Sequence, residues 1–548
     1  MTRRFVFALA AAAMLPVALC AQDFQVKVSE AQEPMQTGKY SPTWESLSRY
    51  EVPDWFRDAK FGMWAHWGPQ CVEGSGDWMA RGMYQEGSKQ YKYHVENYGH
   101  PSEFGFKDIL PLFRAERWNP DSIVGLYKEL GAKYFFALGN HHDNFDLWDS
   151  KYQPWNSAAI GPKKDLLAGW ADACRKHGLK FGVSLHADHA WIFYEPARRY
   201  DRHGDKVGIP YDGRLTAADG KGKWWDGLDP QMLYAQNHPD SFGSWSDDML
   251  GKQWDWGNGA ATPSEFFCTN FYNRTLDVIN RYDPDLLYFD TTAVPFYPVS
   301  DAGMKIAAHF YNHNPSTRGG KSSAVMFGKI LTDEQKEAIV WDVERGAPNY
   351  ISEKPWQTCT CIGNWHYNTS YYDRDRYKSA AQVVKLLADV VSKNGNLLLS
   401  VPLRADGTYD EKEEKIIREI GAWLKVNGEG IFSTRPWTIF GEGPIADTPI
   451  ELKDQGFNEG SYLNAGADEI RFTQTPEHLY AIALGWPENG NILVKSLAKD
   501  SPNYKGRIKR VELVGYGKVP FTCTADGLSV NLPADAPRSI APVLKIAK

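Results

Sequence analysis

Two acidic residues stand at the ends of apolar, strand-like runs that lie far apart in the chain. Asp290 ends the run at 286–290, and Glu344 ends the run at 338–344. Hydrolysis of a glycosidic bond requires two carboxyl groups, one ionised and one protonated, and a retaining enzyme holds them roughly 5–5.5 Å apart. The strands of one parallel barrel bring their carboxyl ends to a single face, where both side chains are held rigidly. The pair therefore predicts a site that cleaves glycosidic bonds.

The protonated carboxyl group of such a pair needs a raised pKa, which comes from apolar surroundings or from a neighbouring carboxylate. For Glu344, a charged Asp290 is the neighbouring carboxylate. The apolar surroundings are expected from Trp341, Trp356 and Trp365. These residues favour Glu344 as the proton donor and Asp290 as the ionised partner.

Histidines stand at the ends of three further apolar runs. If these runs are strands of the same barrel, one rim gathers His66, His141, His142 and His186. Neutral imidazoles exchange hydrogen bonds with sugar hydroxyls. A metal site is the alternative, but residues three apart on a strand face opposite ways, so His186 and His189 would not share an ion, and no HExxH pattern occurs. A metal-dependent hydrolase would lose its activity in chelator.

The composition is that of a folded chain with no nucleic-acid-binding surface. The 548 residues carry a net charge of −7 and no run of Lys and Arg. Aromatic residues reach 14%, with 21 Trp. Rings at a surface or cleft suit sugars, although a large aromatic core would explain the same number.

The first 21 residues predict a secretory signal peptide. Arg3 and Arg4 precede an apolar run that is too short for a membrane span, and small residues follow near its end. Cleavage is expected after Cys20 or Ala21, which places the protein in the periplasm or outside the cell. A lipoprotein lipidated at Cys20 is the alternative, but Leu19 stands where a small residue is preferred. No other apolar run approaches the length of a membrane span.

From about residue 53, strand-like and helix-like segments alternate. The strand candidates are short and almost continuously apolar, as in a parallel sheet covered on both faces, and they lie at 60–68, 133–141, 180–187, 286–292, 322–327, 338–344 and 396–402, with an eighth near 358–363. Segments of helical period lie at 121–134, 165–181, 377–393 and 411–427. This order predicts an α/β fold, with a (β/α)8-like barrel over 22–432.

From 433 onward, short alternating segments replace this pattern. They lie at 469–475, 479–486, 491–497, 508–516, 528–533 and 541–547 and predict a C-terminal antiparallel β-sandwich over 433–548. Within the barrel, residues 192–262 form a long insertion between two strands. Its tryptophans, expected near the sugar, are Trp224, Trp225, Trp245, Trp254 and Trp256.

These segments resemble the α-L-fucosidases of glycoside hydrolase family 29. The likeness runs from about 53 to 440, in several long segments in the family's order: KFGMWAHWG (60–68), DWMARGMYQEGSKQY (77–91), GAKYFFALGNHHDNFDLWDSKYQPWNS (131–157), PDLLYFD (284–290) and SKNGNLLLSVPLRADGT (392–408). The resemblance implies a (β/α)8-like barrel followed by a β-sandwich, the fold that the residue pattern predicts.

The resemblance also implies a role for individual residues. Asp290 matches the family's nucleophile, and Glu344 fits its acid/base, with Asp342 and Glu353 as alternatives. Asp77 stands where the family more often has Glu, and Tyr288 where it usually has Trp. The positions expected to bind the sugar are His66, Asp77, Trp78, His141, His142, His186, Tyr288 and Trp356.

Together these features predict a retaining exo-α-L-fucosidase that needs no cofactor or metal and acts on a fucosylated oligosaccharide or glycoconjugate. An exo-glycosidase on a related sugar such as an α-L-galactoside is one alternative, because an apolar pocket rejects one added hydroxyl only weakly. A non-catalytic carbohydrate-binding protein is another, and it would not need both carboxylates.

Overall fold

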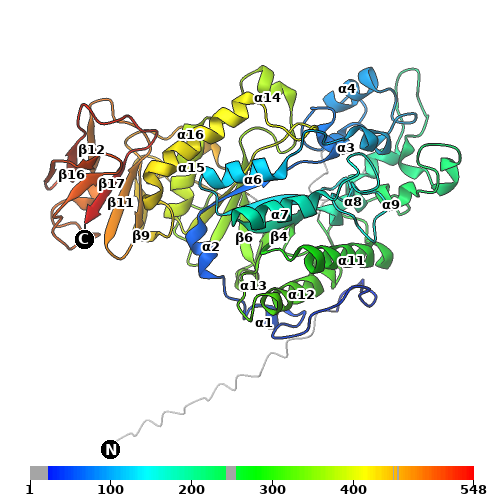
Figure 1. Ribbon diagram of the computed structural model, residues 1–548, viewed down its shortest axis with the longest axis horizontal. Coiled ribbons are helices and arrows are strands. Elements are labelled where there is room, and N and C mark those ends of the chain that lie inside the picture. Colours follow the sequence, from blue (N-terminus) through cyan, green and yellow to red (C-terminus); the bar gives the residue numbers. More distant parts are fainter. Residues whose placement is uncertain (1–22, 242–254, 449, 453–455, 548) are drawn as a thin grey trace, which may run out of the picture.

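The computed structural model describes residues 23–241, 255–448, 450–452 and 456–547. The predicted signal peptide, Trp245 and Trp254 lie outside the described residues. Figure 1 shows a large part rich in helices and, beside it, a smaller part made of strands near the C-terminus. None of the helices in the described part of the chain combines the length and the apolar character that crossing a lipid bilayer requires.

Eight parallel strands close into a barrel in the order of the sequence, as predicted. They are β1 (Phe61–Ala65), β2 (Tyr134–Asn140), β3 (Lys180–Leu185), β4 (Leu286–Thr292), β5 (Val325–Lys329), β6 (Val340–Glu344), β7 (Trp356–Cys361) and β8 (Gly395–Ser400). Most of their residues are buried, because side chains fill the barrel inside and helices cover it outside. Strand β7 is the eighth strand expected near 358–363, and it begins two residues earlier.

Long helices cover the barrel between the strands: α6 (Pro120–Glu129), α7 (Leu166–His177), α11 (Glu265–Tyr282), α12 (Ala302–Thr317), α15 (Ala380–Ser392) and α16 (Glu411–Asn427). Helix α7 begins after Asp165, whose side chain accepts a hydrogen bond from Ala168 N, and ends at Gly178, which has a left-handed backbone with φ of 65°.

The sequence predicted four of the six helices. Helix α11 was missed because buried polar residues such as Arg274 and Asp277 break its apolar period.

Shorter helices lie in the connections: α1 (Trp44–Leu47), α2 (Asp54–Ala59), α3 (Met79–Gly82), α4 (Lys89–Asn97), α5 (Phe106–Ile109), α8 (Ala190–Phe193), α9 (Pro230–Tyr234), α13 (Gln335–Ala338), α14 (Thr369–Asp373) and α17 (Gly460–Leu463). Two buried carboxylates, Asp201 and Asp212, hold the insertion after β3 to the β1–β2 connection. Asp212 accepts hydrogen bonds from Tyr84 and Tyr234, both at 2.7 Å, and from Lys107 at 2.9 Å.

The C-terminal part consists of two antiparallel sheets that share one hydrophobic core, as predicted. The six-stranded sheet, in spatial order, contains β14 (Gly517–Lys518), β13 (Val511–Leu513), β17 (Val543–Ala547), β11 (His478–Ala483), β10 (Ile470–Gln474) and β9 (Arg435–Glu442). The three-stranded sheet contains β12 (Asn491–Val494), β16 (Leu528–Asn531) and β15 (Phe521–Cys523). Strand β9 was missed because most of its residues are only half-buried, so they lack a strict apolar alternation.

A buried ion-pair network joins the barrel to the C-terminal sheets. Figure 1 shows α15 beside β9 at this junction. Asp389 on α15 accepts from Arg471 Nε on β10 at 2.6 Å and from Lys393 Nζ at 2.7 Å. The side chains of Asp389 and Arg471 have no exposed surface. Breaking such a pair leaves a charge in a low-dielectric environment, so the two parts are strongly coupled.

We expect Arg471→Met to lower the free energy of unfolding by about 3 kcal/mol, the lower end of the range for a broken buried pair, because Asp389 keeps Lys393. Chemical denaturation at neutral pH measures this change. The matched control is Arg418→Met, which breaks the half-exposed 2.7 Å pair with Glu414 and should change stability by less than about 0.5 kcal/mol. Equal effects of the two substitutions would show that the junction does not stabilise the chain.

Candidate active site

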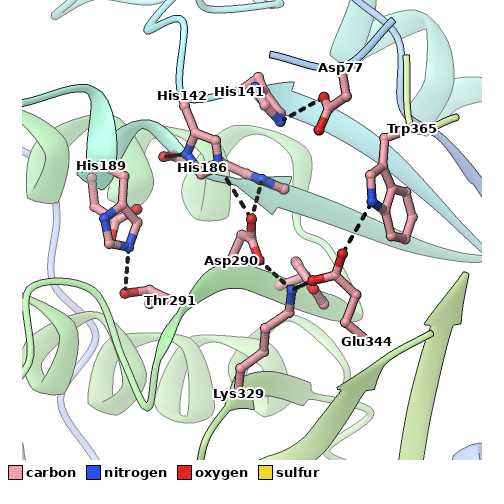
Figure 2. Close-up of polar contacts among 12 residues, drawn as sticks. Asp77, His141, His142, His186, His189, Asp290, Thr291, Lys329, Glu344 and Trp365 are labelled. Carbon is pink, nitrogen blue, oxygen red and sulfur yellow. Dashed lines mark hydrogen bonds and ion pairs between the residues drawn. The ribbon is translucent and has the colours of Figure 1, made fainter. Parts of the chain in front are cut away.

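Three neighbouring strands place two carboxylates and one ammonium group at the carboxyl end of the barrel. Asp290 lies on β4, Lys329 ends β5 and Glu344 ends β6. Lys329 Nζ lies 2.5 Å from Asp290 Oδ1 and 2.6 Å from Glu344 Oε2, so these two oxygens lie no more than about 5 Å apart. Figure 2 shows the ammonium group between the two carboxyl groups. This upper limit is compatible with a retaining glycosidase, in which the carboxyl groups lie roughly 5–5.5 Å apart, and is shorter than the roughly 6.5–9.5 Å of an inverting one.

A local irregularity lies beside Asp290. The β4–β5 pairing shifts register between Tyr288 and Thr292, the segment that contains Asp290. Such bulges bend a strand and re-aim its side chains, and they are frequent next to active sites.

The charges of the three groups depend on one another. Burial alone would raise the pKa of Asp290, but Lys329, His142 and His186 outweigh it and hold that pKa well below its usual range. Burial alone would lower the pKa of Lys329, but Asp290 and Glu344 hold it well above its usual range. Asp290 is therefore ionised and Lys329 charged at neutral pH.

Two histidines contact Asp290 from the side opposite to Lys329. His142 Nε2 lies 3.2 Å from Asp290 Oδ2, and His186 Nδ1 lies 3.6 Å from the same oxygen. Burial lowers the pKa of His186 to about 4, so its imidazole is neutral at neutral pH. The Asp290 carboxylate is thus fixed in position from both sides (Figure 2).

A second group of polar side chains surrounds Asp77. His366 Nδ1 lies 2.6 Å from Asp77 Oδ1, and His141 Nε2 lies 3.8 Å from the same oxygen. Gln70 Nε2 donates to His141 Nδ1 at 2.7 Å, which leaves the proton of His141 on Nε2, facing Asp77. Burial, followed by the neighbouring histidines, lowers the pKa values of His66 and His141 well below their usual range. These rings are therefore neutral donors and acceptors.

Several imidazole nitrogens of this group are buried without a hydrogen-bond partner among the described residues. They are His66 Nδ1, His66 Nε2 and His366 Nε2. Buried polar atoms are normally satisfied, so unpartnered nitrogens around a cavity indicate atoms that a ligand would satisfy. Sugar hydroxyls, which both donate and accept, suit neutral imidazoles.

The same side chains lie close enough to one another to be considered as ligands of a metal ion. Donor atoms of His66, Asp77, His141 and His366 lie within 4.8 Å of one another, and so do those of His141, His142 and His186. A tetrahedral zinc ion with bonds of about 2.0–2.1 Å needs nitrogen or oxygen donors in this arrangement, so the residue types fit a transition-metal ion. However, a metal there would occupy the same space as a ligand hydrogen-bonded to these rings.

Members of both groups line one cavity of about 1150 Å³, whereas Gln70 and His366 do not line it. Trp365 also lines it and donates from Nε1 to Glu344 Oε1 at 3.1 Å. Of the residues predicted for the site, the cavity is lined by His66, Asp77, Trp78, His141, His186, Tyr288, Asp290 and Glu344. Trp78 has a left-handed backbone with φ of 62°, a strained conformation of the kind that clusters at functional sites.

The structure corrects several predicted positions. Trp356 begins β7, so it lies at the opposite end of the barrel, where its indole is buried and donates to Lys393 O. Glu353 lies at that end too, since its carbonyl accepts from Asn394, just before β8. Asp342 is buried beneath the site, bonded to Gln357 and Cys359, and does not line the cavity. His142 contacts Asp290 and does not line the cavity either.

The described tryptophans of the insertion do not line the cavity, contrary to expectation. Trp224 is half-exposed and donates to Asp108 Oδ1, and Trp225 is buried. Trp256 is buried and stacks on His189, with ring centroids 5.4 Å apart. Asp255 is the insertion residue of the described part that reaches the cavity. The described part of the insertion therefore contributes Asp255 to the cavity and none of its tryptophans.

Sequence reasoning missed Lys329, His366 and the lining role of Trp64. Lys329 was missed because the predicted strand ended at 327, two residues before the true end of β5. His366 lies in the loop after β7, which no strand-end criterion covers. The sequence does contain a signal for His366. The Trp365–His366 pair follows a barrel strand, so it lies at the same rim as the other histidines.

Comparisons with known proteins agree on one family. The Alpha-L-fucosidase family model matches residues 27–429, and the model of the Alpha-L-fucosidase C-terminal domain matches 464–547. The chain is 25% identical to the human plasma alpha-L-fucosidase, over 90% of this chain and 89% of that protein, and 25% identical to the human tissue alpha-L-fucosidase, over 94% and 91%. It shares its fold with the crystal structure of Thermotoga maritima alpha-fucosidase in complex with a mechanism-based inhibitor, at a TM-score of 0.65 and 24% identity, over 93% and 100% of the two chains.

A pH-dependent stability difference is expected for Asp342→Asn. Burial raises the pKa of Asp342 to about 6, compared with 3.8 in an unfolded chain. Its stabilising contribution is fully present below pH 3.8 and is lost as the pH rises through about 6, a change of about 3 kcal/mol. The asparagine variant lacks this loss, so its free energy of unfolding relative to the parent should rise by about that amount between about pH 4 and pH 7.5.

Equilibrium denaturation across this pH range measures the difference. Asp333→Asn, at a fully exposed carboxylate, is the matched control and should give a flat difference. A flat difference for Asp342→Asn as well would show that Asp342 has no raised pKa. The substitution also changes the hydrogen bonds with Gln357 and Tyr288, but that loss is the same at every pH. It therefore does not change how the stability difference varies with pH.

Proposed function

We propose a function from the premise that the chain belongs to the α-L-fucosidase family, whose model matches residues 27–429. The chain hydrolyses terminal α-L-fucose from glycans with retention of configuration at the anomeric carbon. The observation that carries this proposal is the pair of carboxyl groups, Asp290 and Glu344, whose nearest bridged oxygens lie no more than about 5 Å apart. That separation leaves no room for a water molecule to attack directly and suits a covalent intermediate.

In the first step, Asp290 attacks the anomeric carbon of fucose. Its carboxylate oxygen forms a bond to C1 while the bond from C1 to the glycosidic oxygen breaks, and Glu344 gives its proton to the leaving oxygen. Asp290 suits this role because Lys329, His142 and His186 hold its pKa well below the usual range against the effect of burial.

In the second step, water attacks C1 from the side that the leaving group has vacated. Glu344, now a carboxylate, takes a proton from this water, and the bond between C1 and Asp290 breaks, which restores the Asp290 carboxylate. Trp365 Nε1 and Lys329 Nζ both donate to Glu344 and hold its carboxyl group in position at the cavity.

The sugar hydroxyls fit the neutral imidazoles on the other side of the cavity. We assign His66, His141, His186 and Asp77 to hydroxyl contacts, and Trp78 to the apolar face of the sugar. His366 does not line the cavity and acts through Asp77, whose carboxylate it contacts at 2.6 Å. His142 instead positions the Asp290 carboxylate.

The proposed substrate is a fucosylated oligosaccharide or glycoconjugate. The predicted signal peptide at 1–21 places the reaction in the periplasm or outside the cell. No step of this mechanism requires a cofactor or a metal ion.

We expect Asp290→Asn to lower kcat for an aryl α-L-fucoside by at least about 10³-fold, because the attacking carboxylate is lost. Proton NMR of early hydrolysis by the parent should show α-L-fucose as the first product, which demonstrates retention. Asp333→Asn is the exposed control and should leave kcat unchanged. Unchanged turnover in Asp290→Asn, or β-L-fucose as the first product, would contradict the mechanism. Turnover of an α-L-galactoside in preference to the fucoside would favour the related sugar.

We expect full activity after exhaustive treatment with chelator, because acid–base and nucleophilic groups are both supplied by side chains. Added Zn²⁺ should inhibit by competition with substrate, since donor atoms of His66, Asp77, His141 and His366 lie within 4.8 Å of one another and the first three residues line the cavity. Initial rates at several concentrations of substrate and Zn²⁺ measure this. Loss of activity in chelator, with recovery on adding a metal, would establish the metal-dependent alternative.

A further inference from the structure

The cavity continues beyond the two carboxyl groups on the side away from the histidines. Its residues there come from the ends of β5 and β6 and from the segment after β9, and they are Ile330, Arg345, Glu451, Phe457 and Asn458. At about 1150 Å³, the whole cavity exceeds the roughly 300–1,000 Å³ of typical ligand pockets. A single deoxysugar on the histidine side leaves this second region open.

The segment at 456–459 is bound directly to the end of β6. Phe457 N donates to Glu344 O at 2.8 Å, and Glu459 N donates to Arg345 O at 2.9 Å. Gly456 allows this approach, because a Cβ at that position would lie 2.0 Å from Glu344 O and its φ is 130°. The segment therefore begins its contact at the residue that we assign as the acid/base.

Side chains fix the same segment a second time. Asn458 accepts from Ala347 N at 2.9 Å and donates to Ala347 O at 3.0 Å. Glu459 accepts from Arg345 Nε at 2.9 Å and from Thr360 Oγ1 at 2.7 Å. With backbone and side chains both bonded to the barrel, Phe457 is held in one place at the rim.

Phe457 is nevertheless 61% exposed, although it lines the cavity. Its backbone is left-handed, with φ of 61°, and so are those of its cavity neighbours Ile330 and Arg345. A phenyl ring on an anchored backbone beside a polar cavity offers a flat apolar surface of the kind on which the C–H face of a pyranose packs. The ring packs little within the protein, so its exposed area is available to a ligand.

We propose that Phe457 is the platform for the sugar of the leaving group, and that this chain cleaves fucose from oligosaccharides in which a pyranose follows the fucose. The inference rests on the proposed function, because it takes Glu344 as the group that protonates the glycosidic oxygen. That oxygen lies between the fucose and the leaving group, so fucose on the histidine side places the leaving group beyond Glu344. Phe457 lies there, with its amide bonded to the carbonyl of Glu344.

Two substrates separate this inference from the proposed function. In α-L-fucosyl fluoride the leaving group is a single atom, which cannot contact Phe457 and needs no protonation by Glu344. In a fucosylated lactose the leaving group is an oligosaccharide. We expect Phe457→Ala to lower kcat/KM for fucosylated lactose about tenfold, to change kcat/KM for the fluoride by less than twofold, and Phe457→Tyr to restore the oligosaccharide rate.

The matched control is Phe266→Ala, which removes a phenyl group of similar exposure, 66%, at the start of α11. It should change neither rate. Since Phe457 is mostly exposed, its removal is not expected to unfold the chain, and thermal melting of each variant checks this.

Equal rates of the parent and Phe457→Ala on fucosylated lactose would overturn the inference. An equal loss on both substrates would also overturn it, because it would assign Phe457 to the fucose site or to the fold. A parent that cleaves the fluoride but none of a panel of fucosylated lactoses with different linkages would overturn it as well. A parent that cleaves neither substrate would overturn the proposed function, and the platform with it.

Discussion

The site depends on one interaction, the contact of the Lys329 ammonium with the carboxylates of Asp290 and Glu344. Two carboxylates about 5 Å apart repel each other, and in a buried setting that repulsion would protonate one of them. The ammonium group at 2.5 and 2.6 Å from the two offsets the repulsion. The surroundings of the two carboxyl groups differ, because His142 and His186 contact Asp290 alone. The arrangement thus keeps Asp290 ionised before it attacks the sugar, because these contacts hold its pKa well below the usual range.

Burying this set of charges carries a large desolvation cost, which rigid geometry must offset. The barrel supplies that geometry, since Asp290, Lys329 and Glu344 lie on three strands that are hydrogen-bonded side by side. The histidines, by contrast, must remain uncharged. They surround a site that already holds a charged lysine, and burial keeps His66, His141 and His186 neutral. A neutral imidazole can donate to one hydroxyl and accept from another, so the same burial that would penalise a cation creates a surface for a polyol.

Much of the site could be predicted because a parallel barrel turns a sequence pattern into a position. A polar residue at the carboxyl end of an apolar run reaches the rim, and this rule located Asp290, Glu344 and His66. The rule also explains the error at Trp356, which begins its strand and therefore lies at the other end. Lys329 was missed because the apolar run ends at 327, whereas β5 continues for two more residues to Lys329. His366 was missed because tertiary contacts determine the place of its loop. One of these contacts is its bond to Asp77, which lies 289 residues away in the sequence.

The C-terminal part of the chain takes part in the site through the connection between β9 and β10 and not through its sheets. After β9 the chain returns to the barrel, and Gly456 approaches β6 so closely that no other residue fits there. The junction at Asp389 and Arg471 fixes the start of β10, and the bonds of Asn458 and Glu459 fix the returning segment. The connection leaves the six-stranded sheet at β9 and returns to it at β10, while the barrel binds its residues 456–459. Phe457, a residue from outside the barrel, is thereby placed among the residues that line the cavity.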